Sequence, residues 1–552
     1  MKTLFSCGLS QGAEPWWSDA VIYEIYLRSF ADSDGDGIGD LAGVNDHLDH
    51  LVELGVDAIW LTPFFPSPGY DHGYDVSDFT AVDPVFGNAA SFESIIQSAH
   101  SHDIRVLVDV VPNHTSNQHP WFLASLDRHP NNVYRDYYLW RDPAADGGPP
   151  NNWRSNFGGS AWTLDAESGQ YYHHSYLPEQ PDLNWRNEHV YDEWVRILKF
   201  WLRKGVDGFR IDVAHNLVKH AEFPDNPPAK NSGTEDNLPV GRVREARGLE
   251  RLYDIDQDEV IEIYRRLRAE LPTTSAGESP FLLGETVLES PERVARYIAS
   301  GRLDSAMWFG TQSMHFDADD LANAIEVAMR PTGGRLAWFL SNHDRSRPAS
   351  RLGGQSERGA DRALATAAVI LTMPGPYLLY QGEELGAMDL EVYAADSKDP
   401  IAVRAGETDM ARDRARAPMP WADVPGRGFS SNPSWLPHGP LPPAGSVAAQ
   451  QRNVDSHLHR WRRLIATWGR YRPGLPREVA ITTNGPVLSV RRGTLHVIGN
   501  FGKEPMSIAD HVERAAVVIW RSLPSDAANL SPEHVRAEEV VWLYCNEQEN
   551  GQ

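Results

Sequence analysis

Cysteine is almost absent from this chain of 552 residues, which carries only Cys7 and Cys545, near opposite ends. Proteins held together by disulfides carry many more cysteines, so a disulfide framework is excluded. The two alternatives left are one disulfide between the ends or two free thiols. Free thiols fit a reducing compartment, and we therefore expect a cytoplasmic location.

Long apolar runs and an excess of positive charge are absent as well. No run approaches the roughly 20 apolar residues that a membrane helix needs. Residues 1–14 lack the apolar core of a signal peptide. The formal net charge is −25, which repels nucleic acid phosphates and anionic membranes. We therefore expect neither nucleic acid nor a membrane as a partner.

From residue 20 onward, short apolar segments alternate with amphipathic ones. The predicted strands are 21–26, 58–61, 106–111, 208–212, 281–284, 304–307, 336–340 and 377–380. The predicted helices are 41–54, 90–102, 190–204, 258–270, 321–329, 362–371 and 454–468. Eight strand–helix units predict an α/β fold, the closed parallel (β/α)8 TIM barrel. Its active site lies at the carboxyl ends of the strands.

Two regions depart from this alternation. Residues 113–186 are rich in Pro, Asn, Gly, Trp and Tyr without a clear period, and predict a loop-rich domain inserted after the third strand. After residue 475 only short strands follow, at 487–490, 494–499, 515–519 and 540–543, which predicts an antiparallel β domain. The expected division is a tail at 1–14, the barrel at 15–112 and 187–470, the inserted domain at 113–186 and the C-terminal domain at 471–552.

Polar residues gather at the carboxyl ends of four predicted strands, which a barrel brings to one mouth. They are Asp109, Asn113 and His114, then Arg210 and Asp212, then Glu285, and last His343 and Asp344. Arg210 favours the charged form of Asp212, and neighbouring negative charge favours a proton on Glu285. One ionised and one protonated carboxyl group are what a glycoside hydrolase uses. Taken singly, each residue is explained as well by a strand-end cap or an ion pair.

With these strand ends in place, the chain resembles the α-amylase superfamily, glycoside hydrolase family 13, over about residues 15–545. The four strand ends match the four family motifs in order and spacing. Residues 70–75 (Tyr-Asp-His-Gly-Tyr-Asp) and 380–384 (Tyr-Gln-Gly-Glu-Glu) agree as well. Residues 180–184 (Gln-Pro-Asp-Leu-Asn) resemble the fifth motif of the branch that holds oligo-1,6-glucosidases and α-glucosidases.

The resemblance implies a role for each residue of the site. Asp212 would be the nucleophile, Glu285 the general acid and base, and Asp344 the transition-state stabiliser. The residues implied to line the glucose subsite are Asp71, Tyr74, His114, Arg210 and His343. Arg412 resembles an arginine that closes this subsite with Asp71, although Ala411 replaces the glycine often found before it, and Arg416 is the competing candidate.

An acidic, glycine-rich loop precedes the helix predicted at residue 41. Asp32, Asp34, Asp36 and Asp40 alternate with Ser and Gly, a spacing of oxygen ligands that suits Ca²⁺ or Mg²⁺. The resemblance also implies a metal here, with the carbonyl of Ile38 as a further ligand. Residue 43, where a calcium-hand loop needs an acid, is glycine, so this is another kind of loop. We expect a structural metal and no organic cofactor; the alternative is an empty acidic turn that caps the helix.

The function expected from these features is a retaining, exo-acting α-glucosidase for short oligosaccharides, which hydrolyses them or transfers glucose to another sugar. An oligo-1,6-glucosidase and an isomerase that forms trehalose or isomaltulose are the alternative enzymes. A non-catalytic relative that only binds is the alternative of another class. It is disfavoured because all three carboxylates are present.

Two signals conflict on the linkage that is cleaved. Val213 is the residue found at this position in relatives that prefer α-1,6 bonds. The continuation 214–216 (Ala-His-Asn) and residues 253–260 look more like α-glucosidases that act on maltose. We expect the α-1,4 preference, because one side chain in a pocket shifts selectivity by only about 1–3 kcal/mol. The sequence predicts no oligomeric state.

Overall fold

The computed structural model describes residues 3–5, 14–129, 131–229, 248–353, 358–393, 396–406, 410–442, 444–512, 516–524 and 533–545. Cys7, residues 230–247 and Ala515, where a strand was expected to begin, lie outside them. Among the described residues, no helix has both the length and the apolar character to cross a membrane.

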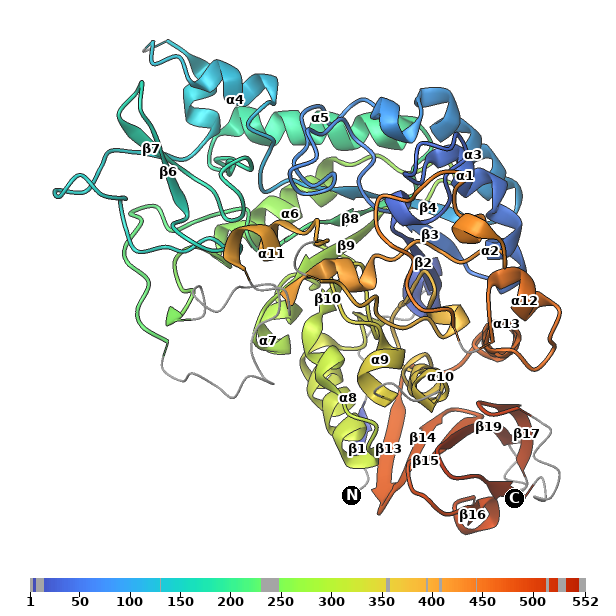
Figure 1. Ribbon diagram of the computed structural model, residues 1–552. Coiled ribbons are helices and arrows are strands. Elements are labelled where there is room, and N and C mark those ends of the chain that lie inside the picture. The colour runs from blue at the N-terminus through green and yellow to red at the C-terminus, as the bar shows by residue number, and fades with distance from the viewer. Residues whose placement is uncertain are drawn as a thin grey trace.

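Eight parallel strands close into a barrel, which confirms the predicted fold class (Figure 1). The strands are β2 (Val21–Ile25), β3 (Ala58–Leu61), β4 (Arg105–Val110), β8 (Gly208–Ile211), β9 (Phe281–Thr286), β10 (Ser305–Trp308), β11 (Leu336–Phe339) and β12 (Tyr377–Tyr380). The barrel closes where β12 pairs with β2, with Tyr377 opposite Val21. All eight lie within two residues of their predicted bounds.

Side chains of the barrel strands alternate between the interior and the surrounding helices. Inward residues such as Ile22, Leu107 and Leu283 form an apolar plug inside the barrel. Their outward neighbours, such as Tyr23 and Val108, belong to the core beneath the helices. Two residues beyond the plug, the inward positions become polar, and this change marks the level of the site.

Helices surround the barrel. They are α1 (Leu41–Asp46), α2 (Leu48–Leu54), α3 (Ala89–Ser101), α5 (Glu188–Arg203), α6 (Glu259–Glu270), α7 (Pro291–Ala295), α8 (Ala318–Thr332), α9 (Pro348–Gly353), α10 (Arg358–Ile370), α11 (Pro400–Ala405), α12 (Val447–Gln451) and α13 (His457–Tyr471). One long helix was expected over 41–54. It is divided because His47, at φ −112° and ψ 15°, leaves the helical conformation. Asp40 caps α1 as predicted, accepting a hydrogen bond from Gly43 N at 2.7 Å.

The segment inserted after β4 has more regular structure than its sequence predicts. It contains α4 (Pro120–Ser125) and a small antiparallel sheet of β5 (Trp140–Arg141), β7 (Gln170–His173) and β6 (Trp162–Asp165). Backbone pairing of His114 with Asp182 joins the two ends of this segment. The insertion therefore begins and ends beside the barrel mouth.

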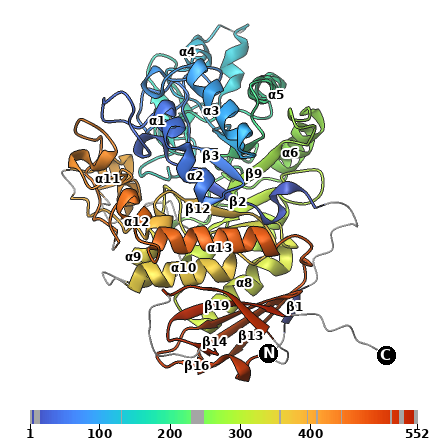
Figure 2. The same cartoon turned by 90° about the vertical axis from the view of Figure 1, so that its right-hand side faces the viewer.

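A six-stranded antiparallel sheet forms most of the C-terminal region. Its order is β1 (Thr3–Phe5), β13 (Val479–Asn484), β14 (Val487–Arg492), β15 (Leu495–Asn500), β19 (Glu539–Cys545) and β17 (Ala516–Arg521), and β16 (Met506–Ser507) pairs separately with β18 (His534–Val535). Figure 2 shows α8, α10 and α13 between this sheet and the barrel. Residues 1–14 were expected as a tail, yet β1 lies within them and pairs with β13, with Leu4 opposite Ala480.

Candidate active site

Four inward positions above the apolar plug carry charge. They are Glu24 on β2, Asp109 on β4, Arg210 on β8 and Glu285 on β9, each at most 4 % exposed. Period-two alternation places them there, since each follows an inward apolar or glycine position by two residues. Gly208 leaves room on β8, because a Cβ there would lie 2.3 Å from Phe281 O. These residues form one polar layer across the barrel.

Arg210 is the centre of this layer. Its Nη1 donates to Asp212 Oδ1 at 2.7 Å and to Asp109 Oδ1 at 2.9 Å, and its Nη2 lies 2.8 Å from Glu285 Oε2. One guanidinium therefore joins three carboxylates from three neighbouring strands. Asp212 and Glu285, far apart in the sequence, are fixed against the same cation.

The protonation of this cluster differs from expectation at Asp212. Burial raises the pKa of Asp212 well above its ordinary value, even though Arg210 acts to lower it. Burial likewise raises the pKa of Asp109 to about 7 against the effect of Arg210. The sequence predicted that Arg210 would hold Asp212 ionised. In the folded protein that single positive charge is shared among three acids, so burial outweighs it.

Backbone strain lies beside these carboxylates. Val213, directly after Asp212, has φ 37°, a conformation that β-branched residues rarely adopt and that costs about 1–3 kcal/mol. Its N–H donates to Glu285 Oε2 at 3.1 Å, and Ala214 N–H donates to Glu285 O at 2.8 Å. The strained turn thus holds Glu285 beside Asp212.

Asp344 follows β11, and its pKa is shifted in the opposite direction from that of Asp212. Burial acts against its ionisation, but His343, Arg412 and Arg416 together hold the pKa of its carboxyl below the usual range. Arg416 Nη2 donates to Asp344 Oδ1 at 2.6 Å. Asp344 is therefore an anion at neutral pH, next to acids that retain protons more readily.

Another part of the pocket wall holds an ion pair between distant parts of the chain. Arg412 Nη2 donates to Asp71 Oδ1 at 2.6 Å and to Asp399 Oδ1 at 2.9 Å. Gln180 Nε2 donates to the second oxygen of Asp71 at 3.1 Å. Arg412 lines the pocket with Asp71, whereas Arg416 binds Asp344. The structure therefore distinguishes the two competing arginines.

A pocket that opens to solvent lies above this cluster. Of the predicted residues, it is lined by Asp71, Tyr74, His114, Asp212, Glu285, Asp344 and Arg412. Arg210 and His343 are fully buried and do not line it. They contact residues that do, since His343 Nε2 lies 2.8 Å from Tyr74 Oη. Both were expected to touch sugar directly, and the structure places them behind the wall.

Several wall residues were not predicted. They include Asn156, Phe157, Tyr176, His215, Arg251, Phe309, Arg345 and Met410. Most of them lie in loops, where the sequence shows no periodic pattern that could predict which side chains line the pocket. Glu24, which contacts His343 Nδ1 at 2.6 Å, was missed although the inward alternation of its strand points to it.

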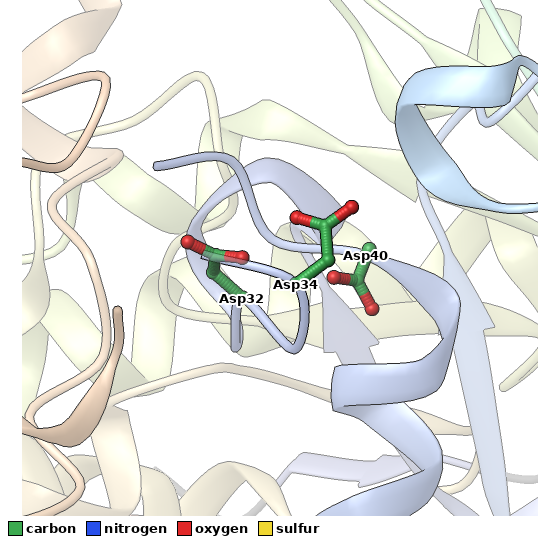
Figure 3. A group of neighbouring side chains, drawn as sticks. All are labelled: Asp32, Asp34 and Asp40. Carbon is green, nitrogen blue, oxygen red and sulfur yellow. The ribbon is translucent and has the colours of Figure 1, made fainter. Parts of the chain in front are cut away.

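The acidic loop before α1 brings three carboxylates together. Asp32, Asp34 and Asp40 each place an oxygen within 4.8 Å of the others (Figure 3). Asp36 does not belong to this group. Its carboxylate accepts a hydrogen bond from Ile38 N at 2.7 Å. An all-oxygen donor set of this kind fits Ca²⁺ or Mg²⁺. Of the four predicted carboxylates, three therefore converge and Asp36 lies outside the group.

The family model of the α-amylase catalytic domain matches residues 24–472. This chain belongs to the α-amylase family. A probable α-glucosidase of Rhizobium meliloti is 38% identical over 460 residues, 82% of each chain. An oligo-1,6-glucosidase of Parageobacillus thermoglucosidasius is 34% identical and covers 82% of this chain and 83% of its own. The α-glucosyl transfer enzyme XgtA has a similar structure, with TM-score 0.87 and 35% identity over 97% of this chain and all of its own. The resemblance seen in the sequence is therefore confirmed.

Proposed function

We propose that this family member is a retaining α-glucosidase that removes single glucose units from the non-reducing end of short α-linked glucosides. The observation that carries the proposal is the pocket with Asp212, Glu285 and Asp344 along its wall. The Asp71–Arg412 ion pair on the same wall would close the pocket beyond one sugar unit. Relatives named α-glucosidase and oligo-1,6-glucosidase support the same activity.

Each carboxylate has one part in the proposed reaction. The reactive form has the proton on Glu285 and an ionised Asp212, which Arg210 favours. Glu285 donates this proton to the glycosidic oxygen while the Asp212 carboxylate attacks the anomeric carbon, so the leaving group departs and a covalent glucosyl-enzyme forms. Water then attacks the same carbon, Glu285 takes its proton, and the bond to Asp212 breaks. Asp344, held ionised, stabilises the positive charge that develops on the sugar ring.

The first test measures both chemistry and stereochemistry. The enzyme should release nitrophenol from 4-nitrophenyl α-glucoside, and time-resolved NMR should show α-glucose before mutarotation. Asp212→Asn and Glu285→Gln should each reduce kcat by at least about 1,000-fold and still fold, since neutralising a clustered acid does not destabilise it. Initial β-glucose would exclude double displacement, and near-native activity of either variant would refute its role.

Linkage preference is the second point to test. Val213 lines the pocket next to the nucleophile, but its backbone is set by the Glu285 contacts, and it is one of many wall residues. We therefore expect kcat/KM to be higher for maltose than for isomaltose. The measurement is the ratio of the two in wild type and in Val213→Ala. A ratio strongly in favour of isomaltose, reversed by the substitution, would show that Val213 decides the linkage.

Transfer of glucose to a second sugar is a further activity of the same site. A sugar hydroxyl can replace water in the second step, because Glu285 can deprotonate either nucleophile. The similarity to a solved α-glucosyl transfer enzyme favours testing it. Product chromatography at high maltose concentration, where trisaccharides would accumulate, distinguishes transfer from hydrolysis.

The loop over residues 32–40 would bind one structural Ca²⁺ or Mg²⁺ ion. Asp32, Asp34 and Asp40 supply carboxylate oxygens. The loop adjoins α1 rather than the pocket, so the ion would brace the fold and take no part in the reaction.

A further inference from the structure

Arg345 is a wall residue of the pocket to which the proposed reaction gives no role. It follows Asp344 in the sequence, and its guanidinium lies over the ring of Phe309, 5.0 Å from the centroid. Phe309 is itself 5 % exposed and lines the pocket. Stacking on a buried ring fixes the direction of the guanidinium.

The side chain of Arg345 has no hydrogen bond and no ion pair among the described residues, and its Nε is buried without a partner. The two other arginines on the pocket wall are neutralised. Arg251 binds Asp254 and also donates to Asn156 Oδ1 at 2.7 Å, and Arg412 binds Asp71 and Asp399. Arg345 is thus the one pocket-lining arginine, within the described parts of the chain, that lacks a counterion.

The nearest acids do not serve as the counterion of Arg345. Burial lowers the pKa of Arg345 to about 9, with Asp344 and Glu285 acting in the opposite direction from a distance. Asp344 is bound by Arg416, and Glu285 is paired with Arg210. The guanidinium remains protonated at neutral pH, so a partly buried positive charge lines the pocket without a hydrogen-bonded counterion of its own.

The position of Arg345 relates it to the leaving group. Glu285 ends β9, Phe309 follows β10 and Asp344 follows β11, three neighbouring strands of the barrel. The Arg345–Phe309 pair therefore forms the wall between the proposed acid and Asp344. Among the described residues it shares no hydrogen bond or ion pair with Asp71 or Arg412, where the non-reducing glucose would end. Glu285 would protonate the leaving oxygen, so this wall faces the leaving group.

We infer that Arg345 binds an anionic group on the leaving part of the substrate, a carboxylate or a phosphate, so that α-glucosides with an acidic aglycone are preferred. The inference rests on the α-glucosidase activity proposed above. A guanidinium presents a planar fork of donors that matches both anions. Without such a charge, the carboxylates of this pocket would repel an acidic aglycone.

The experiment compares pairs of substrates that differ in the charge of the aglycone. One pair is 4-carboxyphenyl and 4-carbamoylphenyl α-glucoside. The other is maltose and maltose with a 6-phosphate on its reducing glucose. For wild type we expect kcat/KM to favour the anionic member of at least one pair by about 10- to 100-fold. The pair with the larger ratio identifies the anion.

Three variants test whether Arg345 causes the preference in kcat/KM for the anionic substrate. Arg345→Gln should bring the ratio close to one, and Arg345→Lys should retain part of it because the charge remains. Arg251→Gln, which changes a wall arginine already paired, should leave the ratio as in wild type. Melting temperatures establish that each variant is folded.

The outcomes separate this inference from the proposed function. Equal kcat/KM within both pairs for wild type, or a preference that survives Arg345→Gln, would overturn the role of Arg345. Equal losses on neutral and anionic substrates in Arg345→Gln would instead show a general electrostatic role. Failure to cleave any of the four α-glucosides would refute the α-glucosidase proposal itself.

Discussion

Glu24 contacts His343 from behind the pocket. Its Oε1 accepts a hydrogen bond from His343 N at 3.2 Å and lies 2.6 Å from His343 Nδ1. Burial raises the pKa of Glu24 well above its ordinary value, which favours its protonated form. A protonated carboxyl can donate to Nδ1, which leaves the imidazole proton on Nε2, the nitrogen near Tyr74 and Asp344. Glu24 is therefore a positioning residue that sets the tautomer of His343.

This arrangement gives a prediction with a matched pair of variants. Glu24→Gln keeps a donor toward Nδ1 and should retain kcat/KM within about tenfold of wild type. Glu24→Leu leaves the buried His343 groups without a partner and should lose about 10- to 100-fold, because that loss costs about 1–3 kcal/mol. Steady-state kinetics, with melting curves of both variants, provide the measurement. If Glu24→Gln lost as much as Glu24→Leu, an ionised Glu24 would be required instead.

For single residues, the sequence predicts which side chains form the site better than it predicts their pKa values or backbone conformations. Asp212 and Glu285 could be named because strand ends and period-two spacing place them. The raised pKa of Asp212 could not, because it depends on three acids sharing Arg210. The left-handed backbone of Val213 could not be predicted either, since no local pattern predicts valine at φ 37°.

Among the elements, the acidic loop and α1 form one unit. Asp40 caps α1 through Gly43 N and also accepts from Ser33 N at 2.8 Å, so loop and helix share a carboxylate. Gly43 is needed because its α-carbon approaches Ala31, where a Cβ would lie 2.1 Å from the carbonyl oxygen. Substitutions in the loop should therefore change the stability of the barrel more than the activity at the pocket.

Removal of the metal tests this unit. A chelator should lower the melting temperature of metal-loaded protein and change kcat at 25 °C much less, because an ion bound only to the folded state adds stability by mass action. Asp32→Ala should abolish the chelator-dependent shift, whereas Asp36→Ala, outside the converging group, should keep it. An unchanged melting temperature of metal-loaded wild type on chelation would mean that the loop holds no ion.

Elements with a strong period or a buried apolar run were predicted well. Helix α5 (Glu188–Arg203) was expected over 190–204, and its buried stripe includes Val190, Trp194 and Trp201. Strands β5, β6 and β7 were missed because, unlike the equally short barrel strands, they are not apolar runs and show no alternation. Their sheet exists through pairing between distant segments, which a local reading of sequence cannot detect.

For the whole molecule, the C-terminal sheet and the barrel share a core. Trp542 of β19 is fully buried, packs edge-on against Trp468 of α13 and donates to Ala368 O of α10 at 3.0 Å. Arg492 of β14 pairs with Asp19, near the start of the barrel, at 2.8 Å. These contacts indicate that the two parts unfold together.

A substitution at this junction tests that cooperativity. Trp542→Ala should destabilise the protein by about 3–5 kcal/mol, because it leaves a large cavity. Barrel and sheet should still unfold in one transition, and KM should not change, since the pocket is remote. Val517→Ala, on the neighbouring strand β17 and exposed, is the control and should have little effect. Two separate transitions in urea would show that the sheet unfolds independently.

The long-range pairs of the site have a consequence for biosynthesis. Glu24 contacts His343, Asp71 pairs with Arg412, and Asp344 pairs with Arg416. A ribosome adds about 5–20 residues per second, so roughly 20–80 s separate the synthesis of Glu24 from that of Arg416. During that interval the acids of the early strands lack the partners that they have in the folded protein. Strand β2 cannot yet pair with β12. The nascent chain thus remains inactive and exposes apolar strands until most of it has been made, and that is when assistance from a chaperone would matter most.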